Sequence, residues 1–598
     1  MVRTRLLAVL LLALAPAALL AAPVPSGGKA KDVTELPVAD KSMVVIQLNG
    51  IDRTKGRLMK MLEGIDPAKA KDTAKQFDEW LKTTAEGRDL GGLDGEGRAF
   101  VAIGALADLG ADETPVAVLL PVKDYKTFRE KFLTKAEQKS FQKGKGGVDE
   151  VELETTGSAL YLVDTGGGYV AASPSKDTAE VYAGKYDKLT VKQMGAAAEG
   201  FLAADVSVFV NVARVNEEYG GQIAQGRAAV GQLFQLFGGQ LDRGQLEVAK
   251  ALIDGLFQIV EDATGVVIAV DFRPEGFGLR VDGAFTAGSE SDKVLSAESP
   301  ATLKGLADLP KGWATYSASK WGKGVGGIQR KLTSEFASDD DKATAAIEKL
   351  TDLLAANDGE TVGMSGQGFA SLTASTFADP KKVADAKLAV FKALDEGAKY
   401  SNLALKGNPK VTADAQKHAG FSLHAAAIEI DFEGSVKATA DAAQKEAAIE
   451  AMKKLMPEKQ TVFFGTDGKR FVQVSAKDWD EAKKLLDAFT APKEKAGDDK
   501  AFAVTRGQLP AEASYLLLSD ATTLFGLLSE YAGSLGDAIP GGPGAELPKI
   551  GKVKGDPAFV GVAVVAKKQS ARFELFVPAA ALKALSKAAE EGEKEKKE

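Results

Sequence analysis

Three glycines near the middle of the chain have the spacing of a phosphate-binding loop. Gly322, Gly324 and Gly327 form G-x-G-x-x-G between an expected strand at 313–319 and an expected helix. Such glycines let a helix N-terminus approach a pyrophosphate closely. The strand before them alternates apolar and polar residues, whereas a dinucleotide-binding strand is apolar throughout. We therefore expect a strand-to-helix turn that binds no cofactor. We also expect Gly324→Ala to be neutral or stabilising if the φ angle of Gly324 is negative.

Serine and lysine recur at the spacing used by serine–lysine hydrolases. That chemistry needs the serine at a helix start and a desolvated lysine one turn later that acts as the base. The three pairs are Ser140/Lys143, Ser173/Lys176 and Ser317/Lys320. Ser173 instead ends an expected strand before Pro174, and the accompanying S-D-N and K-T-G motifs are absent from the sequence. Polar strand ends with surface lysines explain these pairs better.

The two histidines and a run of aspartates are the remaining candidates for metal binding. His418 and His424 are six residues apart in one expected strand. This spacing places them on one face but about 20 Å apart, too far to share a metal. Asp339-Asp340-Asp341 lacks the spaced oxygen ligands of a calcium loop and is expected to cap a helix. The sequence thus predicts two solvated histidines and no catalytic, cofactor-binding or metal-binding residue.

Composition excludes several classes of function. The 598 residues include no cysteine, so thiol nucleophiles, thiolate metal sites, disulfides and cysteine-linked lipids are excluded. The formal net charge of −8, with no basic arm, argues against nucleic acid as a partner.

The N-terminus has the pattern of a secretory signal. Arg3 and Arg5 precede the apolar run Leu6–Leu20, and small residues follow at Ala21 and Ala22. The run is short for a spanning helix, and no later run is long enough. We expect an exported protein, periplasmic or extracellular, without a transmembrane segment in the mature chain.

The same kind of start signal precedes four apolar strands. Proline suits the residues just before a strand, because its φ is fixed and it has no N–H to donate. The four signals are Leu36-Pro37, Leu202-Ala203-Ala204-Asp205, Leu309-Pro310 and Leu509-Pro510. After each strand the pattern indicates helical segments, a hairpin and a further helix.

Two similar inserts suggest that half of the chain is a copy of the other half. Each is a hairpin followed by a helix that begins with Lys-Asp, at Lys176-Asp177 and Lys477-Asp478, and we expect this pair to cap the helix. We predict an α+β fold built by tandem duplication, each half with mainly antiparallel sheets packed by helices on one face. The predicted segments are a signal peptide at 1–22, a flexible leader at 23–35, a first half at 36–300 (units 36–135 and 202–300, insert 148–185), a second half at 301–590 (units 309–396 and 509–590, insert 420–490) and a charged tail at 591–598.

The Leu-Pro signals, the export signal and the repeated units resemble large uncharacterised exported bacterial proteins built on domains of unknown function. The resemblance implies an exported α+β repeat protein and no particular activity. We therefore predict a non-catalytic binding or scaffold protein with a protein or cell-envelope partner. The alternative is an exported hydrolase whose carboxylate or Ser/Lys site forms only in the fold. A broad sheet face would favour binding, and a deep pocket with convergent carboxylates would favour the hydrolase.

Overall fold

The structure is a computed structural model, and it describes most of the chain between residues 33 and 595. The residues it does not describe are 1–32, 86–87, 105–114, 238–242, 328–340, 367–368, 401–402, 436–444, 447–448, 451, 454–455, 524, 526–556 and 596–598. The expected signal peptide, most of the expected leader, and Asp339 and Asp340 therefore lie outside the described residues. No helix in the described part of the chain is both long and apolar enough to cross a membrane.

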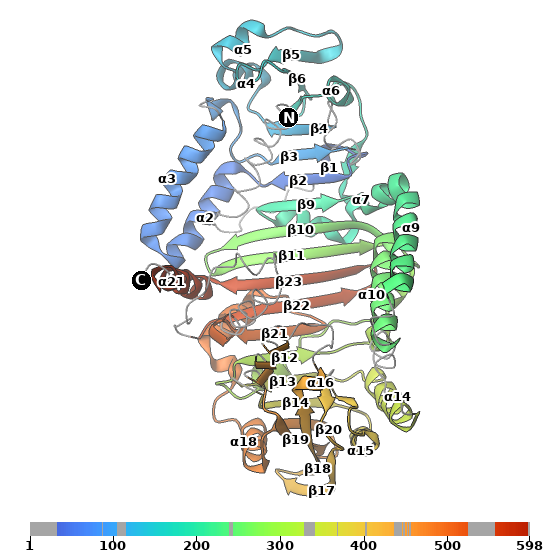
Figure 1. Ribbon diagram of the computed structural model, residues 1–598. Helices are drawn as coiled ribbons and strands as arrows, with labels where there is room; N and C mark the ends of the chain where they lie inside the picture. Colours follow the sequence, from blue (N-terminus) through green and yellow to red (C-terminus); the bar gives the residue numbers. More distant parts are fainter. Residues whose placement is uncertain are drawn as a thin grey trace. The chain divides into compact units, whose positions relative to one another are not determined.

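The fold is α+β with mainly antiparallel sheets, as predicted (Figure 1). The chain divides into two compact units. The first unit contains residues 1–227, 258–291 and 569–574, and the second contains 228–257, 292–568 and 575–598. The short segment 569–574 thus joins the first unit although it lies close to the C-terminus.

The first unit contains an antiparallel sheet with the order β5-β6-β7-β4-β3-β2-β9-β10-β11. Its strands are β2 (Val44–Leu48), β3 (Ala99–Ile103), β4 (Val116–Pro121), β5 (Val148–Glu152), β6 (Ala159–Asp164), β7 (Tyr169–Ser173), β9 (Val206–Val210), β10 (Ala263–Arg273) and β11 (Gly276–Phe285). A separate two-stranded sheet pairs β1 (Glu35–Ala39) with β8 (Lys188–Thr190).

Helices follow the strands at the places that the sequence indicates. After β2 come α2 (Ile51–Ile65) and α3 (Pro67–Thr84), and after β9 come α9 (Val212–Phe237) and α10 (Arg243–Asp262). The shorter helices are α4 (Tyr125–Phe132), α5 (Lys135–Ser140), α6 (Lys176–Tyr182), α7 (Val191–Met194), α8 (Ala198–Ala203) and α11 (Glu290–Ser296). Asp124 caps α4, because its side chain accepts the Thr127 N–H at 2.8 Å.

A buried cluster around Phe128, Leu162 and Val170 lies on one face of the sheet at β5, β6 and β7, and a larger buried cluster of the first unit lies on the other face. Val45, Phe100, Phe209 and Val267 point to this face and pack with Phe201 of α8, all of them buried. Because side chains alternate along a strand, the residues between these four point to the opposite face.

Segment 569–574, the first part of β23 (Ser570–Pro578), pairs with β11. The Phe285 N–H donates to Gln569 O at 3.0 Å. The Arg572 Nε–H donates to Asp282 Oδ1 at 2.6 Å, and Asp282 is buried. Segment 569–574 therefore covers the edge of β11 and holds it through a partly buried ion pair.

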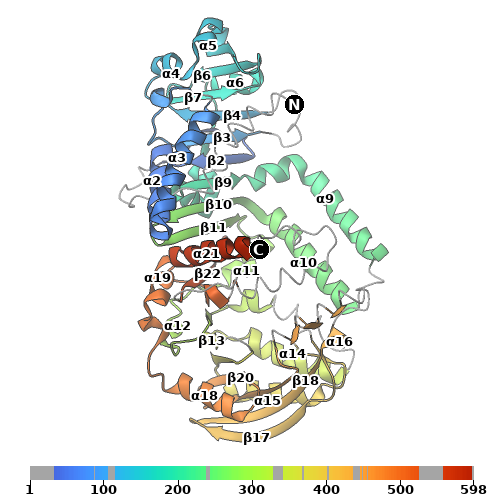
Figure 2. The ribbon, with the colours of Figure 1, turned by 60° about the vertical axis from the view of Figure 1, so that its left-hand side comes forward.

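The second unit contains a sheet with the order β17-β18-β19-β20-β14-β13-β12-β21-β22. Its strands are β12 (Thr315–Ser319), β13 (Thr361–Ser365), β14 (Ser371–Thr376), β17 (Lys410–His418), β18 (Phe421–Asp431), β19 (Lys459–Thr466), β20 (Arg470–Ala476), β21 (Tyr515–Asp520) and β22 (Phe559–Lys567), with short β15 (Lys399–Tyr400) and β16 (Leu403–Leu405) beside β18. Its helices are α12 (Gly305–Asp308), α14 (Asp341–Ala355), α15 (Pro380–Ala393), α16 (Phe432–Ser435), α18 (Trp479–Thr490), α19 (Lys500–Gln508) and α21 (Ala579–Glu595) (Figure 2).

The two halves of the chain share one strand order. The series β6-β7-β4-β3-β2-β9-β10 in the first matches β19-β20-β14-β13-β12-β21-β22 in the second. One side-chain hydrogen bond also recurs: Asp205, before β9, accepts the Phe272 N–H, and Ser514, before β21, accepts the Ala566 N–H. These agreements support the duplication, which remains a prediction.

Three details differ from the sequence-based expectation. Leu36-Pro37 lies inside β1, where Pro37 is tolerated because β1 belongs to a sheet of only two strands. Helix α6 is capped by Ser175, whose Oγ accepts the Thr178 N–H, and not by its Lys-Asp pair. Helix α21 continues to Glu595, so residues 591–595 of the expected tail are helical.

Candidate binding face

The glycine loop of the second unit already holds an anion, the side chain of Glu298. The Gly322 N–H donates to Glu298 Oε2 at 2.6 Å, and the Val325 N–H donates to Glu298 Oε1 at 2.9 Å. Glu298 is buried, and residues 323–327 are helical. A carboxylate of the chain thus takes the place that a phosphate would take at a helix N-terminus. This arrangement explains the glycines without a cofactor.

The expectation for Gly324→Ala is wrong for a steric reason. A Cβ on Gly324 would lie 2.1 Å from Val294 O, and one on Gly322 would lie 2.1 Å from Ala297 O. Both glycines are required because backbone passes directly against them. The sequence could not show this contact, since Val294 and Ala297 belong to the preceding segment of the chain.

The structure uses the serines of the three Ser-x-x-Lys pairs for other contacts. Ser173 Oγ donates to Val116 O at 2.8 Å and accepts the Ser175 N–H, while the Lys176 ammonium lies 3.9 Å from Glu180. Ser140 Oγ donates to backbone carbonyls, and Ser317 lies on β12. These contacts give the serines structural roles.

The histidines lie on two strands and not on one. His418 ends β17 and His424 lies in β18, after a turn at Ala419 and Gly420. His424 is buried, and its Nδ1 accepts the Asp414 N–H at 3.0 Å, which corrects the expectation of two solvated histidines. His418 Nε2 lies 2.5 Å from Asp487 Oδ1. In the described part of the chain, no group of three His, Asp or Glu side chains is placed to hold a metal ion.

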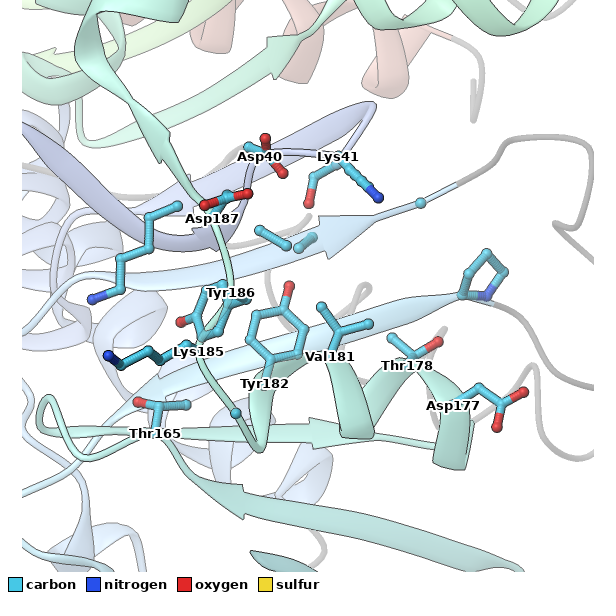
Figure 3. Close-up of a pocket in the computed structure, with 17 residues that line it drawn as sticks. Asp40, Lys41, Thr165, Asp177, Thr178, Val181, Tyr182, Lys185, Tyr186 and Asp187 are labelled. Carbon is cyan, nitrogen blue, oxygen red and sulfur yellow. The ribbon is translucent and has the colours of Figure 1, made fainter. Parts of the chain in front are cut away.

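A cavity of about 870 Å³ lies in the first unit beside β1, β8 and α6 (Figure 3). Tyr182 and Tyr186 lie side by side in it, with their ring centroids 5.1 Å apart. Tyr186 donates its hydroxyl to Pro37 O, and burial raises the pKa of Tyr182 to about 12. Three lysines and three aspartates line the rest: Lys41, Lys185, Lys188, Asp40, Asp177 and Asp187. The balanced charges and the engaged tyrosine hydroxyl favour no particular class of ligand.

On six neighbouring strands, the sheet face opposite Val45, Phe100 and Phe209 is apolar throughout. We call it the apolar face, and it comprises three positions on each of six neighbouring strands. These positions are Val116, Val118 and Leu120 on β4, Ala99, Val101 and Ile103 on β3, Val44, Ile46 and Leu48 on β2, Val206, Val208 and Val210 on β9, Val266, Ile268 and Val270 on β10, and Leu279, Val281 and Gly283 on β11. An antiparallel sheet with one wet face normally has polar residues on that face.

Segment 569–574 extends the apolar face by one strand. Gln569 O accepts the Phe285 N–H, and Ala571 O lies near Gly283, so the segment runs antiparallel to β11. Continuing this register places Phe573 beside Val281. Ile46, Val208, Ile268, Val281 and Phe573 then form one row across five strands.

Part of the apolar face is covered and part is open. Val101 and Val118 are buried, and Ile51 of α2 packs on Leu48 at one end. In contrast, Ile268 is 42% exposed and Phe573 is 40% exposed. Ile46, Val208 and Val281 in the same row are half-buried. The open part therefore presents aliphatic and aromatic side chains to solvent at the centre of a sheet.

Sequence reasoning missed this face, although a signal was present. In GVVIAVDF the five residues Val266 to Val270 are all apolar, and in VSVFVNV after Asp205 only Ser207 and Asn211 are polar, which indicates strands that are largely apolar on both faces. This pattern is the usual sign of a strand buried between two layers. Only the structure shows that one of these two faces is partly open.

The matched face of the second unit has the opposite chemistry on three strands. We call it the hydroxyl face, and its nine positions are Thr315, Ser317 and Ser319 on β12, Thr361, Gly363 and Ser365 on β13, and Ser371, Thr373 and Ser375 on β14. Some of the hydroxyls bond to each other, as Thr361 Oγ1 does to Ser375 Oγ at 2.8 Å. The neighbouring strands β21 and β22 keep apolar residues such as Leu517 and Val562 on this side.

A lysine with an altered pKa borders the hydroxyl face. Lys387 of α15 donates to Gln473 Oε1, and Gln473 pairs with Thr373. Its ammonium also lies 5.8 Å from the ring centroid of Phe391. Burial lowers the pKa of Lys387 to about 8.

Comparisons with protein-family models, with curated proteins and with solved structures found no match. The resemblance to exported bacterial proteins is untested by these comparisons and remains a prediction.

Proposed function

We propose that this protein is an exported, non-catalytic binding protein whose ligand lies on the open part of the apolar face. The observation that carries the proposal is the exposure of Ile268 and Phe573 within a surface of eighteen apolar side chains and one glycine. Exposed apolar patches on single chains are often interaction or ligand sites, because leaving them in water costs free energy.

The rival function, hydrolysis, has less support. Ser173, the serine of one Ser-x-x-Lys pair, is buried and donates its hydroxyl to a backbone carbonyl. The cavity beside α6 contains aspartates and lysines in equal number, and its buried Tyr182 is packed against Tyr186. The apolar face, in contrast, has a single chemical character over many residues, which is what a binding surface needs.

Export and duplication form part of the same proposal. Arg3, Arg5 and the leucine-rich run after them support a cleaved signal, and N-terminal sequencing of exported protein would test it. Recovery of an intact Met1 on exported material would contradict it. The shared strand order of the two halves supports duplication.

The binding proposal is tested with an environment-sensitive apolar dye and the full chain. Ile268→Glu places a charge in the open row, and Leu256→Glu places one on α10, where Leu256 is 62% exposed. We expect Ile268→Glu to reduce dye binding at least tenfold and Leu256→Glu to change it less than twofold. Phe573→Ser, an uncharged variant at the other end of the row, should also weaken binding. Equal dye binding by the Ile268→Glu variant and the original chain would overturn the proposal.

A further inference from the structure

We propose that the ligand of the apolar face is a long-chain fatty acid, whose hydrocarbon chain lies across the strands along the row from Ile46 to Phe573. This inference rests on the proposed binding function and names its ligand. It follows from four properties of the face: its lack of polar groups, its backbone pairing, its area and its length.

The chemistry of the open row favours a hydrocarbon. All of its side chains are aliphatic or aromatic: Ile46, Val208, Ile268, Val281 and Phe573. None of them can donate or accept a hydrogen bond. A ligand with polar groups along its length would lose hydrogen bonds to water and gain none. The body of the ligand must therefore be apolar.

The backbone of the face argues against a peptide. Strands β2, β9 and β10 each have a paired strand on both sides, so their N–H and C=O groups are already bonded. Segment 569–574 likewise covers the edge of β11. Peptides that bind sheets usually add to a free edge, where their own backbone groups find partners. A peptide lying across this face would find none.

The area argues against a second copy of the chain. Thirteen positions, Phe573 included, are half-buried or exposed, and each occupies about 33 Å² of a sheet with strands about 4.8 Å apart and same-face residues about 6.8 Å apart. The open part is thus about 430 Å². A stable protein–protein interface buries about 800 Å² on each partner. The face is too small to hold two copies together by itself.

The length of the row matches one acyl chain. Ile46 and Phe573 are separated by four strand spacings, which is about 19 Å. The hydrocarbon core of a bilayer is about 30 Å thick and contains two chains end to end, so one chain spans about 15 Å. A single chain therefore fits along the row and leaves its carboxylate in solvent at one end.

The experiment measures binding of octanoate, laurate and palmitate to the full chain by calorimetry after removal of bound lipid. We expect affinity to rise about two- to fourfold per added methylene, because each methylene is covered only on one side. Ile268→Glu should weaken palmitate binding at least tenfold, and Leu256→Glu should leave it unchanged. Phosphatidylcholine vesicles, the second arm, should not bind.

Each other outcome has a defined meaning. Loss of dye binding in Ile268→Glu without any fatty-acid binding would overturn the fatty-acid assignment but leave the proposed binding function in place. Vesicle binding that Ile268→Glu abolishes would replace the fatty acid by a membrane lipid. A dimer by light scattering that Ile268→Glu dissociates would replace it by a second copy. Dye and palmitate binding that Ile268→Glu leaves unchanged would overturn both proposals. Val208→Ser provides a milder change if Ile268→Glu fails to fold.

Discussion

At matched positions of the two halves, β2, β3 and β4 present valine, isoleucine, leucine and alanine where β12, β13 and β14 present serine, threonine and glycine. The opposite, core-facing positions are mainly apolar in both halves, as Val45 and Phe100 in the first and Tyr316 and Ala318 in the second show, although Gln47 and Ser207 also face the first core. The strand order therefore depends on the core-facing residues, and the other face is free to take on a different chemistry.

This difference between the two faces shows that the open apolar face needs an explanation. The hydroxyl face is the ordinary surface of an antiparallel sheet in water, and the half-exposed Ser317 needs no special explanation. A face that stays apolar while Ile268 remains open to solvent needs one, because such a surface promotes association. Binding of an apolar ligand provides it.

The largest effect on the free energy of unfolding is expected at Asp205 and Ser514, where the two halves share a hydrogen bond but only Asp205 carries a charge. Asp205 is buried, and its carboxylate accepts from Arg57 Nη1 at 2.8 Å and from the Phe272 N–H, whereas the uncharged Ser514 hydroxyl accepts the equivalent Ala566 N–H. Asp205→Ala should cost about 3–5 kcal/mol, because it leaves Arg57 without its carboxylate. Ser514→Ala should cost about 1–2 kcal/mol.

Urea unfolding of the two variants checks this comparison. If the two losses were equal, the charge at Asp205 would add nothing to the hydrogen bond that both halves share.

A smaller effect is expected in the glycine loop, which the first half lacks. Gly324→Ala should lower stability by about 1–3 kcal/mol, because its Cβ would collide with Val294 O. Gly327→Ala is the matched control, since a Cβ there meets nothing within 4 Å. It should be neutral or stabilise the helical segment by up to about 1 kcal/mol. Thermal unfolding measures both, and a stable Gly324→Ala variant would contradict the steric argument.

The sequence predicted the order of the helices and strands well, because helices and strands depend on local patterns of residues. The strands, the helix cap at Asp124 and the hairpins of both halves follow from apolar alternation, capping residues and turns. Long-range contacts were beyond it. Neither the carboxylate of Glu298 in the glycine loop nor the pairing of Gln569 with Phe285 has a local signal. The apolar face needed both kinds of information, the pattern and the exposure.

We expect the stability of the protein to depend on pH through Lys387, which borders the hydroxyl face. Burial lowers the pKa of Lys387 to about 8, while an unfolded lysine has a pKa of about 10.4. Between these two values the unfolded chain binds more protons, so stability should rise as the pH increases from about 8 to 10.4. Since the side chain is only half-buried, the rise should be about 1 kcal/mol.

Denaturant unfolding across this pH range, compared with Lys387→Met, isolates the contribution of the lysine. If the free energy of unfolding of the original chain fell between about pH 8 and pH 10.4, and that of the Lys387→Met variant did not, the pKa of Lys387 would be raised and not lowered.

The smallest effect on stability is expected from making the two faces alike. Ile46→Ser copies Ser317 onto the apolar face at a half-buried position. It should cost only about 0.5–1 kcal/mol, because little additional apolar area is lost. Dye binding should nevertheless fall severalfold. Unchanged dye binding with normal stability would place the ligand away from β2.

The position of segment 569–574 has a consequence for how the chain is made. The first sheet receives its last strand from residues that leave the ribosome after more than 560 others. Until then β11 has an open edge, and Asp282 lacks Arg572. Exposed strand edges are prone to pair with other chains, and pairings distant in sequence form slowly. The N-terminal half is therefore at greatest risk of aggregation during synthesis, and a chain that stops at residue 568 would keep that risk permanently.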